Sequence, residues 1–95
     1  MNSEEALSLL RDGVSGYFVD DSIEDGINQM REHYFASKSH PEWHQRQQAF
    51  RIVLEHCSSS DVDNLVQHGF NRYLPMLEGG AKKFLSHIYE SVFET

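Results

Sequence analysis

The sequence predicts an all-α protein, a compact single-domain bundle of about five helices spanning residues 1–95. Apolar residues recur at three- and four-residue spacings along nearly the whole chain, and no stretch alternates apolar and polar residues as a half-buried strand would. Hydrophobic residues make up 39% of the chain and aromatic residues 12%, which is enough for one compact core. No repeat and no long linker divides the chain, so a single domain is expected.

The first helix is predicted to begin at Asn2 or Ser3, because Asn2 followed three residues later by Glu5 forms a capping-box pattern. It is expected to end near Gly13, since glycine weakens a helix. Its apolar stripe consists of Leu7, Leu10, Val14 and Tyr17.

The second helix is predicted to follow the segment Asp20-Asp21-Ser22, which offers an N-cap and acids that suit a helix N-terminus. It is expected to end between Ser37 and Ser39. Its buried stripe is predicted to contain Ile23, Ile27, Met30 and Tyr34.

The third helix is predicted to start at Pro41, with His40 or Ser39 as its cap, because proline is favoured in the first turn. Its stripe comprises Trp43, Gln47, Phe50, Val53, Leu54 and Cys57. Ile52 lies opposite this stripe, so it is covered either by another element, of which segment 71–78 is the favoured candidate, or by a partner.

The fourth helix is predicted to be capped by Ser60 and to end at Gly69, with Phe70 making a Schellman-type contact. Segment 71–78 contains Pro75, which interrupts a helix, and Gly79-Gly80 is the clearest break in the chain. A last helix is predicted from Ala81 to the C-terminus. Its apolar residues cover a wide arc, so it is expected to pack against two neighbours at the centre of the fold: Ala81, Phe84, Leu85, Ile88, Tyr89, Val92 and Phe93.

The charge of the chain is unevenly distributed. Fifteen acids against eight Lys and Arg give a net charge of −7, and residues 1–32 carry eight of these acids with only two arginines. Such a domain repels phosphate backbones and anionic lipids, so neither nucleic acid nor a membrane is expected as a partner. An acidic end favours a basic protein partner through electrostatic steering.

The second helix sharpens this expectation. Each residue turns the helix by about 100°, so positions can be given as angles around the helix axis with Ile23 at about 0°. On this scale the residues of the buried stripe lie within about 40° of Ile23, whereas the opposite face spans roughly 100° to 200°. That face holds Glu24, Asp25, Asn28, Glu32 and Phe35. Phe35 is either an aromatic anchor within an acidic binding face or a core residue that folds back near the helix end.

Motifs for catalysis, metals and cofactors are weak. His40 and His44 are four residues apart, but Pro41 stands where a zincin motif has its acid, and whether these histidines bind a metal stays open. The single Cys57 excludes a disulfide framework and is predicted to pack as an apolar residue. No catalytic residue, metal site or cofactor is therefore predicted.

No signal-peptide pattern opens the chain and its longest apolar runs are three residues, so a cytoplasmic location is expected.

The small size, the acidic charge and the stretch Asp20-Asp21-Ser22-Ile23-Glu24-Asp25 together resemble the immunity proteins that bacteria make against their own nuclease toxins, of the colicin and contact-dependent inhibition types. The chain lacks the tyrosine pair sought after the acidic helix in the colicin family. The resemblance implies a non-catalytic protein that covers the basic cleft of a cognate toxin domain, with carboxylates in place of substrate phosphates. The resemblance carries over no individual residue, and the contacts expected from the acidic stretch and the helical wheel are Asp21, Glu24, Asp25, Glu32 and Phe35, with Tyr17 as a further candidate.

Two other classes remain open. A helical adaptor or regulator would act through homo- or hetero-oligomerisation, by way of Ile52 or the wide face of the last helix. A small metal-dependent enzyme would be built on the histidines and would retain stoichiometric metal on purification.

Overall fold

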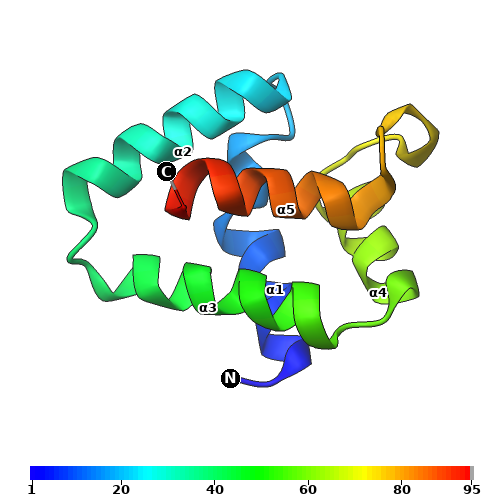
Figure 1. Ribbon diagram of the computed structural model, residues 1–95, viewed down its shortest axis with the longest axis horizontal. Coiled ribbons are helices and arrows are strands. Elements are labelled where there is room, and N and C mark those ends of the chain that lie inside the picture. The colour runs from blue at the N-terminus through cyan, green and yellow to red at the C-terminus, as the bar shows by residue number, and fades with distance from the viewer. Residues whose placement is uncertain (95) are drawn as a thin grey trace.

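The computed structural model describes residues 1–94, and every regular element within that range is helical (Figure 1). The helices are α1 (Ser3–Gly13), α2 (Ile23–Ser37), α3 (Pro41–His56), α4 (Ser59–Asn64) and α5 (Gly80–Phe93). Three short helical turns lie between them: η1 (Ser15–Tyr17), η2 (Leu65–Gly69) and η3 (Leu74–Met76). The predicted all-α bundle is therefore confirmed.

Side-chain caps fix where the helices start. Asn2 accepts a hydrogen bond from the Glu5 N–H, and Ser22 accepts one from the Asp25 N–H, as predicted. His40 caps α3 through Nδ1, which accepts a hydrogen bond from the Glu42 N–H at 3.3 Å. Each cap satisfies one of the backbone donors that a helix N-terminus leaves without a partner.

The predicted cap of the fourth helix is wrong. Ser58, not Ser60, has an extended backbone and accepts a hydrogen bond from the Asp61 N–H at 3.2 Å, and Ser60 lies inside α4. Three consecutive serines are chemically equivalent caps, so the local sequence does not choose between them.

The end of the fourth helix also differs from the expected pattern. Helical structure does end at Gly69, but the final turn, η2, is a π-helix in which the Phe70 N–H donates to the Leu65 carbonyl at 3.1 Å. The left-handed residue that follows is Asn71, with φ of 55°, rather than the glycine. Phe70 is fully buried against the rings of Phe18 and Phe84, which are tertiary contacts rather than the Schellman-type contact that was predicted.

Helix α5 is the centre of the bundle, as its wide apolar arc predicted. It lies between α2 and α3 and also contacts α4 (Figure 1). Helix α1 packs against α3 and crosses behind it in this view. The core includes two aromatic groups, which are Phe18, Phe70 and Phe84 near α4, and Tyr34, Trp43, Phe50, Tyr89 and Phe93 between α2, α3 and α5.

Ile52 and the wide face of α5 are both engaged within the fold. Ile52 is partly buried against the core, and the helices that α3 contacts most extensively are α1 and α5. The apolar arc of α5 is buried against α2, α3 and α4, except for Phe93, which is partly buried. None of the helices within residues 1–94 is long and apolar enough to cross a membrane.

Candidate functional site

The outward face of α2 carries free negative charge. The side chains of Glu24, Asp25 and Glu32 are exposed, and within residues 1–94 none of these carboxylates forms an ion pair or hydrogen bond. Glu24 and Asp25 lie in the first turn, where the helix dipole stabilises negative charge. Their position explains why unpaired acids are tolerated here, and it leaves both carboxylates available to a partner.

Phe35 is exposed rather than folded back into the core. Half of its surface, 51%, is accessible, and its ring packs on Tyr34 with centroids 5.5 Å apart. The Lys38 ammonium lies 5.6 Å from the centroid of the Phe35 ring, so a cation as well as Glu32 adjoins this aromatic residue. Phe35 also lies roughly 16 Å along the helix from Glu24, at 1.5 Å per residue. The strongest concentration of acids is therefore at the other end of α2.

Tyr17 lies on a different flank of α2 from Phe35. Its hydroxyl is hydrogen-bonded to His33 Nδ1 at 2.7 Å, and the two rings meet edge to face. His33 and Phe35 are two residues apart and so point about 160° apart around the helix. Burial raises the pKa of the Tyr17 phenol above its ordinary value of 10.0, with Arg46 acting in the opposite direction. Tyr17 consequently does not share one surface with Phe35.

Asp21 is held at the start of α2 by contacts from two directions. Its carboxylate accepts a hydrogen bond from Gln29 Nε2 at 3.2 Å, and its carbonyl accepts one from Arg72 Nη2 at 2.6 Å. The same Arg72 nitrogen also donates to the Phe18 carbonyl. Arg72 thereby ties segment 71–77 to the loop that precedes α2, a link across some fifty residues of chain that no sequence pattern indicated.

Two exposed apolar residues lie within four positions after Arg72, and the sequence did not indicate them. Tyr73 is 68% accessible and Met76 is 79% accessible, so both are more exposed than Phe35. In the sequence, segment 71–78 was interpreted through Pro75 as a helix breaker and as the favoured cover for Ile52, and neither interpretation indicated exposed side chains. The signal that could have found them is the spacing of Tyr73 and Met76 by three residues, one turn of a 3₁₀-helix, beside a second such pair in Leu74 and Leu77.

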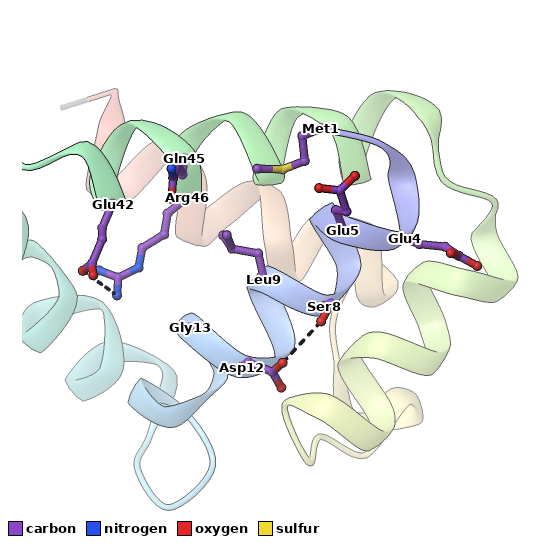
Figure 2. Close-up of a pocket in the computed structure, with 10 residues that line it drawn as sticks. All are labelled: Met1, Glu4, Glu5, Ser8, Leu9, Asp12, Gly13, Glu42, Gln45 and Arg46. Carbon is purple, nitrogen blue, oxygen red and sulfur yellow. Dashed lines mark hydrogen bonds and ion pairs between the residues drawn. The ribbon is translucent and has the colours of Figure 1, made fainter.

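A groove of about 720 Å³ lies between α1 and α3. Figure 2 shows Leu9 and the Arg46 side chain pointing into it, with Arg46 reaching Glu42 at 3.6 Å. The charged side chains that line it are Glu4, Glu5, Asp12, Glu42 and Arg46. Because four acids face one arginine, the groove is a second acidic surface, formed by α1 and α3.

The histidines are not gathered into a site. No group of three or more His, Cys, Asp or Glu side chains within residues 1–94 is arranged to hold a metal ion. His40 is engaged as the cap of α3, and the nearby Glu42 lies 4.0 Å from its Nδ1. Cys57 is the C-cap residue of α3 and is partly buried against the core.

Comparison with protein-family models, with curated proteins and with solved structures found no match to this chain. The functional argument therefore depends on the geometry of the chain itself.

Proposed function

We propose that this chain is a non-catalytic binding protein whose acidic surface engages a basic protein partner. The observation that carries the proposal is the set of unpaired carboxylates on the outer face of α2, at Glu24, Asp25 and Glu32. Charges that no internal group neutralises attract cations from solution and steer a basic surface toward the helix.

The form of this activity that we favour is that of an immunity protein for a nuclease-type toxin. A nuclease cleft is positively charged because it attracts a phosphate backbone. A rigid helix with carboxylates spaced along one face presents negative charge to such a cleft without being a substrate. Occupying the cleft is then sufficient for inhibition, and no catalytic group is needed on this chain.

The test is affinity capture with matched baits from a lysate of the organism that encodes the protein. Wild-type protein and the double variant Glu24→Lys/Asp25→Lys are immobilised, and retained proteins are identified at low and at high salt. A basic protein retained by the wild type at low salt, and lost with the charge-reversed bait, supports the proposal. The purified partner should cleave nucleic acid alone and lose that activity in the complex.

Two results would count against it. Equal retention of the same protein by both baits removes the α2 face as the binding surface. A captured basic partner whose activity on nucleic acid is unchanged in the complex removes the toxin-inhibitor form while leaving binding intact. Circular dichroism of the variant is the control, since both substituted side chains are exposed and the fold should be unaffected.

The second candidate is a helical adaptor that acts through oligomerisation. The surfaces first expected to serve it, Ile52 and the arc of α5, are engaged within the fold. What favours it instead is the exposure of Tyr73 and Met76, because aromatic residues and methionine are enriched at protein interfaces. A dimer in light scattering that is insensitive to salt would support the adaptor over the inhibitor.

A further inference from the structure

The segment Tyr73-Leu74-Pro75-Met76, here named the apolar turn, presents two large apolar side chains to solvent. The turn η3 has three residues per turn, and the Met76 N–H donates to the Tyr73 carbonyl at 3.0 Å. Tyr73, the residue before η3, and Met76, its last residue, are joined by this bond and are both exposed, and we call them the exposed pair. Leu74 and Leu77, by contrast, are partly buried against the core.

This turn is held in place from both ends. Arg72 precedes it and is bonded to the carbonyls of Phe18 and Asp21. The Leu77 N–H donates to the Leu74 carbonyl at 3.0 Å, and the Gly80 N–H donates to the Leu77 carbonyl at 3.1 Å. The exposed pair therefore sits on a preorganised support, which lowers the entropy cost of using these side chains in an interface.

Acids border the apolar turn on two sides. Through Arg72 it adjoins the start of α2, where Asp20, Asp21, Glu24 and Asp25 are exposed. Through Leu74 it adjoins α4, because Leu74 lines the same hollow as Asp61 and Asp63. Figure 1 shows this segment beside α4 and the start of α5. The nearest cations in sequence are Arg72, Lys82 and Lys83, so the six acids named here outnumber the cations around the turn.

We infer that the apolar turn is the anchor through which this protein docks on a basic protein surface that offers an apolar pocket. The inference rests on the proposed function and gives its acidic surface an anchor other than Phe35. Tyr73 and Met76 fill the pocket, and the acids at the start of α2 and on α4 pair with the surrounding cations. A buried aromatic residue within a charged rim is the arrangement that concentrates binding energy at protein interfaces.

The probes for the test are three short labelled peptides, and their affinities are measured by fluorescence anisotropy. The first alternates lysine and leucine, the second has serine in place of leucine, and the third has glutamate in place of lysine. The lysine–leucine peptide is expected to bind about tenfold more tightly than the lysine–serine peptide, and the glutamate peptide should not bind. Equal affinity of the first two peptides would overturn the inference.

Variants then locate the binding site. Tyr73→Ser/Met76→Ser is expected to weaken the lysine–leucine peptide about tenfold and to leave the lysine–serine peptide within about twofold. Phe35→Ser is the matched control, an exposed aromatic residue outside the turn, and is expected to change neither affinity. If Phe35→Ser produces the loss and the turn variant does not, the anchor is Phe35 and the inference is wrong.

The charge-reversed variant Glu24→Lys/Asp25→Lys separates this inference from the proposed function. It is expected to weaken both lysine peptides. If it does so while the turn variant has no effect, the acidic surface binds cations but the apolar turn is not its anchor. If neither variant has an effect, both proposals fail. A dimer that Tyr73→Ser/Met76→Ser converts to a monomer would show that a second copy covers the turn, which also overturns the inference.

Discussion

Gly26 is the position at which one added methyl group should destabilise this fold most clearly. A Cβ atom built on Gly26 would lie 2.5 Å from the Phe18 ring and 2.6 Å from the Tyr17 carbonyl oxygen. Both distances are far below van der Waals contact. Gly26 is therefore the residue that allows η1 and Phe18 to pack directly against α2.

The size of the effect follows from two opposing contributions. Overpacking a well-packed core costs about 1–3 kcal/mol. The upper part of that range applies here because Phe18 is fully buried against Phe70 and Phe84 and one of the clashing atoms belongs to the backbone. Alanine is a better helix former than glycine by about 1 kcal/mol. We therefore expect Gly26→Ala to lower the free energy of unfolding by about 1–2 kcal/mol.

Urea unfolding followed by far-ultraviolet circular dichroism measures this difference directly, with thermal unfolding as a second readout. For a domain of this size the loss corresponds to a fall in Tm of roughly 5–15 °C. Gly13→Ala is the matched control, because a Cβ at Gly13 meets only Arg46 Nε, at an ordinary 3.7 Å. That variant should be as stable as the wild type or more stable by up to about 1 kcal/mol.

The opposite order of stabilities would refute the reasoning. If Gly26→Ala is as stable as the wild type, the close approach of Phe18 to α2 does not exist in solution. The role of η1 in placing Tyr17 and the start of α2 would then also have to be revised.

Three further predictions concern a cap, the core and a titration. Ser58→Ala should destabilise the protein by about 1 kcal/mol, whereas Ser60→Ala should leave the free energy of unfolding nearly unchanged, as compared by urea unfolding, because only Ser58 caps α4. Phe50→Ala should cost about 3–5 kcal/mol in the same assay, since the ring is fully buried between Tyr89 and Phe93, and a smaller loss than Leu54→Ala would contradict its central place. The pKa of Tyr17 is raised, so the stability that its neutral phenol contributes is complete below pH 10 and declines as the pH rises through the folded-state pKa. Phenolate absorbance compared with that of Tyr17→Phe should show this tyrosine titrating above its ordinary value, and a normal midpoint would mean that Tyr17 is not desolvated.

The boundaries of the helices were largely predictable because they depend on local chemistry. Asn2, Ser22 and His40 cap helices in the structure. The side chain of each accepts a hydrogen bond from the backbone N–H of a residue two or three positions later. The serine run, residues 58–60, is a case in which local chemistry does not determine the helix start. Ser58 and Ser60 are equally good caps in isolation, and only the structure shows that Ser58 is the one used.

The candidate surface was predictable only in part. The helical wheel placed Glu24, Asp25 and Phe35 outside the buried stripe of α2, because burial on one helix follows from its own periodicity. It could not show that Lys38 lies over Phe35, or that Tyr17 faces His33 on another flank. Those contacts depend on side-chain directions and on a neighbouring turn.

By itself, the sequence determined the helical class, the buried stripes, the starts of three helices and the excess of negative charge at the N-terminal end. These properties belong to single residues and to the period of one helix, so they can be read without knowing which segments meet. Only the tertiary structure decided that Arg72 joins segment 71–77 to the start of α2 and that Tyr73 and Met76 stand exposed beside the acids there. Contacts of this kind join groups some fifty residues apart in sequence, such as Arg72 and Phe18. They form only when folding brings distant segments together, so the local sequence does not reveal them.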